Sequence, residues 1–472
     1  MSTQWLRTAL LAWGLGMSMP VAALDLVDAY NLAVDHDPVL RHARLERDSG
    51  FAGRAVERAG LLPQLQLSYM NAPTNDQEVW YPARNAQSEP IEGYERRDYN
   101  SYAAVLRLQQ PLFDLEAWAR YRQAAAQALF ADEWLRAGAQ ELAVRVLTAY
   151  TDVLFAQDHV ALVVAQQHTL REQQQFNQRL FDEGEGTRTD LIETQARHEI
   201  AAVQGLEARD ALQAARHSLE ALIGMPVTES LAPLLTQFEA LALTPATFEE
   251  WQQIALDHNP MLAAQRHNIE ALSQEILRRR SGHLPKLVAY VSRSRTRSDT
   301  PNTYEQRYDT RTIGLQVTMS LFAGGGVAAS AHQATLNREA ARAELDAQTA
   351  ETLTDLRRQF DVCRNAPAKI RAYERAVQSA QLLIEATRRS VESGTRVNLD
   401  VLDAEQQLSQ SRRDLAEARY TYLIAQLQLH RLAGVLEADD LQRVAELFAP
   451  EPAVRPGSAA RVTSGPPVSP HH

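Results

Sequence analysis

Apolar and polar residues alternate with a period of two in both halves of this chain. From Thr312 to Ser320 the apolar residues stand at every second position, beginning with Ile313. A similar alternation covers 64–69 and 102–109, whereas the stretch from Leu287 alternates less cleanly. A period of two is typical of strands that have one apolar and one polar face. The predicted elements are a β-hairpin at about 62–113 with a loop at 73–100, and a second at about 285–322 with a loop at 299–309.

A long helix is predicted after the first hairpin. Between Leu115 and Phe181 the chain has no proline and a single glycine, Gly138, and it is rich in Ala, Gln, Leu, Arg and Glu. These residues favour helix. At 1.5 Å per residue the run is roughly 100 Å long, which is wider than an ordinary globular core.

A seven-residue period marks the other helical regions. Large apolar residues recur every seven positions along 356–391 and 401–436. In 401–436 most of them are followed three positions later by Ala or Ser, and the same pattern is weaker along 191–222. This period predicts coiled-coil pairs of helices. Cys363 falls in the register and is predicted to be a small core residue, while Pro367 is predicted to kink its helix.

The two halves share their landmarks at offsets of 222 residues near the start and 209 to 210 further on. A tandem duplication with a loop of variable length is the simplest explanation. The matching sites are Asp35–Pro38 with Asp257–Pro260, Leu62–Leu65 with Leu284–Leu287, Pro111–Phe113 with Ser320–Phe322, and Gly184 and Asp190 with Gly394 and Asp400. The predicted division is a first repeat 24–224, a connector 225–247, a second repeat 248–436 and a C-terminal element 437–449.

The ends of the chain differ from the rest in composition. Residues 1–23 contain Arg7, an apolar run and a final Val-Ala-Ala, which together are typical of a secretory signal peptide. Removing Arg7 takes the formal charge from −11 to −12, so nucleic acid is not expected as a partner. Beyond 23 no run of 18 apolar residues remains, so no spanning helix is expected. The Pro-, Ser- and Gly-rich tail 450–472 is predicted to be disordered.

The strands raise the question of what covers their apolar faces. A small sheet half buried on a soluble core is one interpretation. The other is a membrane barrel, in which open edges are forbidden and at least about eight strands are needed. Since one chain supplies only the four strands of two hairpins, a barrel requires an oligomer. Three copies would give twelve strands, but the periodicity does not choose three over two or four.

Several motifs together resemble TolC-type outer-membrane efflux proteins, the outer membrane factor family. The resemblance covers nearly the whole mature chain. Its motifs are Asp37-Pro38, Asn259-Pro260, Gly282-His283-Leu284-Pro285, the stretch from Val391 to Ala404, and Leu415 to Leu427.

The resemblance implies a fold that is mainly α with a membrane β-barrel. A homotrimer would form a 12-stranded barrel, a long α-helical coiled-coil tunnel through the periplasm, and an equatorial girdle that contains 225–247 and 437–449. The implied location is the outer membrane of a Gram-negative bacterium, in contact with its lipid. The implied partners are a periplasmic adaptor and an inner-membrane transporter of the RND, ABC or MFS type.

Asp400 and Asp403 are the strongest candidates for function. They lie three residues apart and share one face of a helix. From the residues alone, Asp400 can be a capping residue and Asp403 a solvated acid of the first turn. The resemblance instead implies a pore constriction, in which stacked rings of carboxylates attract cations.

The resemblance also implies links that close the entrance and tips that dock partners. The links would join Arg396 to Thr189 and Asp190, and Val391 stands where many relatives have a tyrosine. Gly184 and Gly394 are predicted to end one helix at each turn, with Thr189 and Asn398 beginning the next helices. These two turns would meet the adaptor or the pump.

No catalytic grouping is found, so an enzyme is not expected, nor is a cofactor or a metal. The 13 histidines form no metal-binding pattern, although His36 and His258 occupy matching positions and suggest a duplicated structural role. Gly324-Gly325-Gly326 lacks the Lys-Ser/Thr of a phosphate loop. The leading hypothesis is therefore a passive exit duct for small toxic compounds. The alternatives are an exit duct for type I protein secretion and, in a different class, a periplasmic coiled-coil scaffold without a pore.

Overall fold

One order of elements occurs twice in this chain. The computed structural model describes residues 24–227, 230–235, 238–240, 243–300, 303–393, 395–396 and 398–448. The first half contains α1 (Leu26–His36), α2 (Pro38–Ala59), β1 (Gln64–Arg84), β2 (Pro90–Phe113), α3 (Leu115–Asp182) and α4 (Arg188–Ile223). The second half contains α5 (Phe248–His258), α6 (Pro260–Arg280), a 3-10 helix η1 (Ser281–His283), β3 (Lys286–Arg297), β4 (Arg307–Thr318), α7 (Gly326–Glu392) and α8 (Asn398–Ala433), followed by α9 (Ala438–Ala445). The predicted signal peptide 1–23, the tail 450–472 and Gly394 lie outside the described residues.

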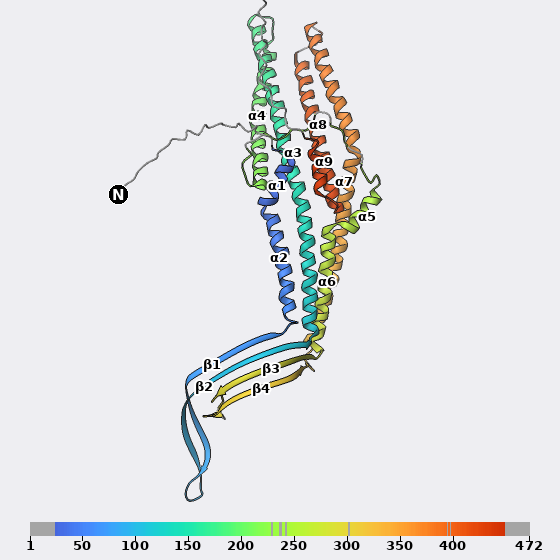
Figure 1. Cartoon of the computed structure of the whole chain (residues 1–472). Helices are drawn as coiled ribbons and strands as arrows, with labels where there is room; N and C mark the ends of the chain where they lie inside the picture. Colours follow the sequence, from blue (N-terminus) through green and yellow to red (C-terminus); the bar gives the residue numbers. More distant parts are fainter. Residues whose placement is uncertain are drawn as a thin grey trace, which may run out of the picture.

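The long helices form two hairpins, α3–α4 and α7–α8, whose turns point to the end of the molecule opposite the sheet (Figure 1). The predicted helix 115–181 is confirmed, since α3 is 68 residues long. α7, with 67 residues, continues through Pro367 as one helix. The proline therefore does not end the helix, and the kink stays a prediction.

Most positions of the seven-residue period in α8 are buried, while Leu408 and Leu415 are partly exposed. The buried positions alternate large residues with alanine and serine, which lets α7 and α8 approach closely. Their burial agrees with the predicted seam, and Cys363 of α7 is buried in the same core, as predicted. The buried positions of this period in α8 are Val401, Ala404, Ser411, Ala418, Tyr422, Ala425, Leu429 and Leu432.

An Asx-Pro pair separates the two short helices in each half. Asp37 accepts a hydrogen bond from the Leu40 amide at 2.9 Å, and Asn259 accepts one from the Leu262 amide at 3.0 Å. Each side chain thus caps the helix that follows, whose first residue is proline. Proline is favourable at this position because the first amide of a helix has no intrahelical acceptor. The break in the helix is therefore encoded locally and was duplicated with the rest of the repeat.

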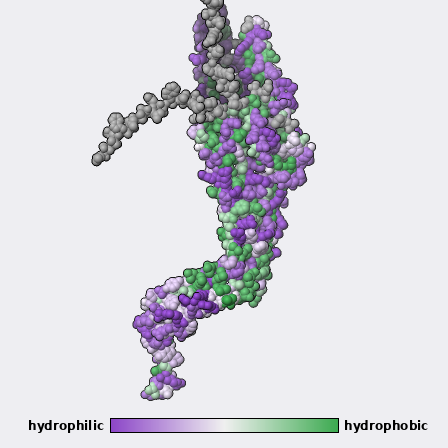
Figure 2. All heavy atoms as spheres, in the orientation of Figure 1, coloured by the Kyte–Doolittle hydropathy of each residue, from purple (hydrophilic) through white to green (hydrophobic). Residues whose placement is uncertain are grey.

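The strands form one antiparallel sheet in the order β1-β2-β3-β4, so the β2–β3 pair joins the two halves. Leu65, Leu108, Val291 and Ile313 lie opposite one another across all four strands. Their exposed fractions are 66%, 42%, 47% and 84%. Figure 2 shows hydrophobic residues gathered where the sheet leaves the helices. The predicted apolar face exists, and no described segment of the chain covers it.

The opposite face of the sheet is polar. Gln109 donates to Gln64 at 3.1 Å, and the Arg107 guanidinium lies 4.7 Å from the centre of the Tyr290 ring. Arg107 also donates to Gln316 across the sheet at 3.4 Å. The alternation predicted from the sequence therefore separates one apolar and one hydrogen-bonded face.

The prediction of a loop at 73–100 is wrong. β1 and β2 continue as a two-stranded ribbon, paired from Asn75 opposite Tyr99 to Arg84 opposite Pro90, after a register shift between Ala72 and Asn75. The prolines that favoured a loop are tolerated because β1 is an edge strand and Pro90 begins β2. The loop predicted at 299–309 is also shorter, because β4 begins at Arg307.

Aromatic pairs stabilise the ribbon at its base and part way along its length. At its base the Tyr99 and Tyr304 rings lie 5.3 Å apart, edge to face, so the loop between β3 and β4 supports it. Further out, Trp80 and Tyr94 pair across the strands with ring centres 4.7 Å apart. Cross-strand aromatic pairs of this kind stabilise a ribbon that is otherwise marginal in water.

The connector and the C-terminal element meet the first helices in a region that we call the waist, the buried cluster around Tyr150, Leu231 and Phe448. Leu231 forms a bridge with Leu24, and Leu234 forms one with Phe448. The Tyr150 hydroxyl of α3 donates to the Leu24 carbonyl at 2.9 Å and accepts from the Ala232 amide at 2.8 Å. The described parts of the connector therefore pack against α3 and the segment that precedes α1.

Helices of the length and hydropathy needed to cross a lipid bilayer are not found in the described parts of the chain.

Candidate functional site

The turn between α3 and α4 ends one helix and starts the next within a few residues. Gly184 has φ +77°, a left-handed conformation that favours glycine, and a side chain there would meet open space. Thr187 caps α4 by accepting from the Asp190 amide at 3.1 Å. The prediction that Thr189 begins α4 is therefore off by two residues, because the capping hydroxyl belongs to Thr187.

A buried polar contact joins α3 to α4 just below this turn. The Asn177 amide donates to the Thr194 hydroxyl at 2.8 Å, and this hydroxyl donates to the Asp190 carbonyl at 2.7 Å. Asn177 is 6% exposed and Thr194 is 2% exposed. Buried hydrogen bonds of this kind fix the register of two helices, because sliding them would leave polar groups unpaired. The position of Asp190 in the turn is thus well determined.

The predicted constriction residues have different surroundings. The Asp403 carboxylate accepts from Arg197 Nη1 of α4 at 2.8 Å. Asp400 is partly exposed and forms no ion pair with the described residues. The two acids therefore differ within one chain: Asp403 is paired with an arginine, and Asp400 has no such partner among the described residues.

Arg197 is shared between two acids and was not found from the sequence. Its Nη2 lies 3.2 Å from the Glu193 carboxylate, one helical turn away on α4. The repeat could have identified its partner Glu193, since an offset of 210 residues places Asp190 on Asp400 and Glu193 on Asp403. Each chain therefore brings two matching pairs of carboxylates to the tips, but Arg197 has no basic counterpart.

A small apolar cluster lies beside the ion pair. It consists of Leu170 of α3, Ala201 of α4 and Leu402 of α8, all buried. Close to it, Gln167 donates to the Ala201 carbonyl at 2.6 Å and crosses Gly205, where a Cβ atom would lie 2.1 Å from the amide nitrogen. Gly205 interrupts the seven-residue period of α4 because α3 approaches it so closely.

The predicted entrance links are not formed within the chain. Thr189, Asp190 and Arg396 are all exposed, and no ion pair or hydrogen bond joins Arg396 to the other two among the described residues. Near the tip of the α7–α8 hairpin, Arg388 of α7 instead pairs with Glu405 of α8 at 2.7 Å. Val391 is partly buried, and Gly394 is outside the described residues.

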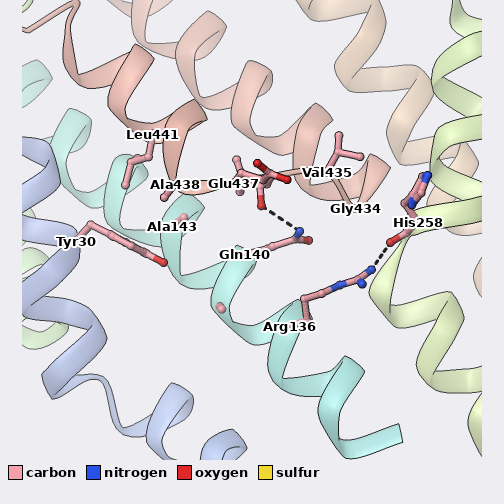
Figure 3. A pocket seen from close by; sticks show the side chains of 12 residues that line it. Tyr30, Arg136, Gln140, Ala143, His258, Gly434, Val435, Glu437, Ala438 and Leu441 are labelled. Carbon is pink, nitrogen blue, oxygen red and sulfur yellow. Dashed lines mark hydrogen bonds between the residues drawn. The ribbon is translucent and has the colours of Figure 1, made fainter. Parts of the chain in front are cut away.

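A cavity of about 480 Å³ lies near the waist, between α3 and the end of α8 (Figure 3). Arg136 of α3 reaches the His258 carbonyl, and Gln140 donates to the Leu436 carbonyl at 3.2 Å. These bonds end on backbone oxygens, so they hold the α5–α6 break and the end of α8 against α3. We interpret the cavity as part of the joint between the two halves.

The two histidines at matching positions serve the same joints. Gly224 has φ +75°, and a Cβ atom there would lie 2.7 Å from the His36 ring. Gly434 has φ +76°, and a Cβ atom there would lie 2.2 Å from the His258 carbonyl oxygen. The backbone at the two breaks is used in the same way, since each break packs on the glycine that ends the last long helix of its half. Only His36 makes this contact with its side chain, so the duplicated role of the histidines stays a prediction.

Comparison with known proteins gives consistent similarities. The profile of the family described as "Outer membrane efflux protein" matches residues 29–225 and 251–435. The chain is 44% identical over 427 residues to the alkaline protease secretion protein AprF of Pseudomonas aeruginosa, covering 90% of this chain and 88% of that protein. It is 41% identical over 441 residues to the proteases secretion protein PrtF of Dickeya chrysanthemi, covering 92% and 93%.

More distant similarities extend over the same length. The outer membrane protein TolC of Vibrio cholerae is 28% identical over 431 residues, covering 91% of this chain and 94% of that protein. The crystal structure of the outer membrane protein VceC from Vibrio cholerae has a TM-score of 0.72 at 17% identity, covering 87% and 96%. This structural likeness concerns the fold alone.

Proposed function

This chain belongs to the outer membrane efflux protein family, and from that premise we propose that three copies of it form one exit duct through the outer membrane and the periplasm. The family consists of outer-membrane channels of Gram-negative bacteria and not of enzymes. What the chain contributes to export is therefore a conduit, while the driving force comes from an inner-membrane transporter joined through a periplasmic adaptor.

The observation that carries the proposal is the sheet. Its four strands leave β1 and β4 with unpaired edges and an apolar face exposed along Leu65, Leu108, Val291 and Ile313. In lipid, unpaired edges are forbidden, so a sheet of this kind must close with copies of itself. Three chains supply twelve strands, a number within the range of bacterial barrels. The apolar face then meets lipid, and the polar face around Arg107 lines the lumen.

The helical hairpins form the periplasmic part of the duct in this proposal. Their length is right for a tunnel, since a helix of 68 residues spans about 100 Å. We divide the chain into the repeats 24–224 and 248–436, with 225–247 and 437–449 forming a girdle at the waist. The pairing of Leu231 with Leu24 and of Leu234 with Phe448 supports this division.

The tips hold the constriction and the contacts with partners. We assign the narrowest ring to Asp400, with Asp403 one turn further along the helix. The exposure of Thr189, Asp190 and Arg396 leaves them available to link neighbouring chains, and the turns at Gly184 and Gly394 to meet the adaptor or the transporter. The lack of an intrachain partner for Asp400 among the described residues supports its role as the carboxylate that binds cations.

A protein is the cargo that the similarities favour. The two relatives at 44% and 41% identity are named for the secretion of proteases, which points to type I secretion with an ABC-type transporter. The second candidate is export of small toxic compounds, and the family's description as efflux proteins favours it. Both cargoes use the same duct.

Complementation separates the two cargoes. In a strain that lacks its own exit duct but retains a protease secretion system and a drug pump, we would express the chain and measure secreted protease and drug susceptibility. Restored protease with unchanged susceptibility is the expected result. Restored drug resistance alone would move the cargo proposal to small compounds.

Planar-bilayer recordings test the duct itself. The purified protein should give discrete single-channel currents that multivalent cations block, and Asp400→Asn should weaken this block more than Asp403→Asn, whose target is already paired with Arg197. A protein that is released from membranes by carbonate and forms no channel would contradict the proposal and favour the scaffold.

A further inference from the structure

We propose that Arg197 is a gating residue of the duct: by bridging Glu193 of α4 and Asp403 of α8, it holds the α7–α8 hairpin against the α3–α4 hairpin at the tips. The inference rests on the proposed function as an exit duct. It assigns the closing force to a contact inside one chain, in addition to any links between neighbouring chains.

The bridge has the geometry of a specific link. One guanidinium nitrogen lies 2.8 Å from the Asp403 carboxylate and the other lies 3.2 Å from the Glu193 carboxylate. The Arg197 side chain is 27% exposed, so part of its stem is already fixed by packing. The neighbouring residue Leu402 packs between Leu170 and Ala201, so an apolar and an ionic contact hold the same turn of α8.

The contacts between the two hairpins are sparse near the tips. Below the bridge, a cleft of about 420 Å³ separates α3 and α4 from α8, lined mostly by polar side chains such as Gln166, Gln204 and Gln406. In the described part of the chain, only one other ion pair joins the hairpins, between Glu141 and Arg431 near the waist. The segments of the hairpins beyond the waist can therefore move apart when the bridge is broken.

Charge strengthens the effect of removing the arginine. Without it, Glu193 and Asp403 face each other as two carboxylates, and like charges repel. Loss of the bridge thus replaces an attraction between α4 and α8 with a repulsion. A half-exposed ion pair changes an equilibrium by about two- to five-fold, so three acting together in a trimer change it on the order of ten- to a hundred-fold.

The chain offers a matched control. Arg388 pairs with Glu405 at 2.7 Å at a similar height, but both residues belong to the α7–α8 hairpin. Arg388→Gln removes the same charge as Arg197→Gln without releasing one hairpin from the other. A difference between the two variants therefore reports on the contact between hairpins and not on charge near the entrance.

The test is single-channel recording of the full-length protein in planar bilayers. We expect Arg197→Gln to spend at least about ten-fold more time in high-conductance states than the native protein, and Arg388→Gln to behave like the native protein. The charge-swapped variant Arg197→Glu/Asp403→Arg should return toward native behaviour, because the arginine on α8 can then bridge Glu193 and the new glutamate. Rising salt should open the native channel and have no such effect on Arg197→Gln, since salt screens the bridge.

Three results would overturn the inference: equal open times for Arg197→Gln and the native channel, equal increases for both arginine variants, or a swapped variant as open as Arg197→Gln. Failure of the proposed function looks different, because the native protein would then give no channel at all.

Discussion

Asp37 and Asn259 occupy the same place in the two halves, yet their side chains meet opposite partners. The Asp37 carboxylate is 2% exposed and accepts from the Leu40 amide at 2.9 Å and from the Arg145 guanidinium at 2.8 Å. The Asn259 amide instead donates to the Leu432 carbonyl at 2.8 Å. We therefore predict that Asp37→Asn is tolerated better than Asn259→Asp, although both exchanges keep an oxygen that caps the helix.

The magnitudes follow from the partners. Asp37→Asn loses only the charge of the pair, and since the Arg145 side chain is 30% exposed and can be hydrated, we expect a loss of about 1–2 kcal/mol. Asp37→Ala also removes the cap, which costs about 1 kcal/mol more. Asn259→Asp places a carboxylate oxygen beside the buried Leu432 carbonyl oxygen, and both atoms are hydrogen-bond acceptors. This costs about 3 kcal/mol unless the new aspartate binds a proton.

Acidic pH should reproduce part of the Asp37→Asn effect. Burial raises the pKa of Asp37, but the hydrogen bonds from Arg145 and the Leu40 amide outweigh it and hold the pKa below its ordinary value. A lowered folded-state pKa means that the stabilisation is complete above the unfolded-state pKa and is lost as the pH falls through the folded-state pKa. The native protein should therefore lose this contribution below about pH 4, whereas Asp37→Asn has none to lose.

Hydrogen–deuterium exchange of the detergent-solubilised protein measures both sites separately. Peptides that cover the first turns of α2 and α6 should exchange faster in the order Asp37→Asn, Asp37→Ala, Asn259→Asp, each relative to the native peptide. Equal protection in Asp37→Asn and Asn259→Asp would refute the reasoning, because the identity of the partner would then not matter.

Three further predictions concern other parts of the chain. Gly224→Ala should lower the midpoint of thermal unfolding more than Gly184→Ala. Both substitutions place an alanine in a left-handed conformation, which costs about 1 kcal/mol, but only at position 224 would the new Cβ atom also collide with the His36 ring. Equal midpoints for the two variants would contradict this. Cys363 is 1% exposed and burial raises its pKa to about 12, so a maleimide should label it only after unfolding, as read by intact mass. Because the helices are proposed to lie in the periplasm, the ribbon at the opposite end should lie outside the cell, and a tag inserted at Gln87, at its tip, should be stained by antibody on intact cells. Staining only after permeabilisation would contradict this orientation.

Much of the fold could be predicted from the sequence because helices, strands and breaks depend on local patterns. The run from Leu115 predicted α3, and the alternation around Ile313 predicted β4. The duplicated Asx-Pro pairs were visible as landmarks of the repeat, and each encodes a helix break locally. The same logic failed at 73–100, where Pro and Asn indicated a loop. Composition does not reveal that β1 is an edge strand, and only an edge strand tolerates such prolines.

The candidate site divides in the same way. The sequence by itself placed Asp190 and Asp400 beside the two turns, because the repeat matches Gly184 and Asp190 with Gly394 and Asp400. Only the tertiary structure decided that Asp403 meets Arg197, a residue 206 positions away, while Asp400 stays without an ion pair among the described residues. Periodicity states which face of a helix a side chain occupies, but the partner on the next helix depends on how the two hairpins pack, and no local pattern carries that information.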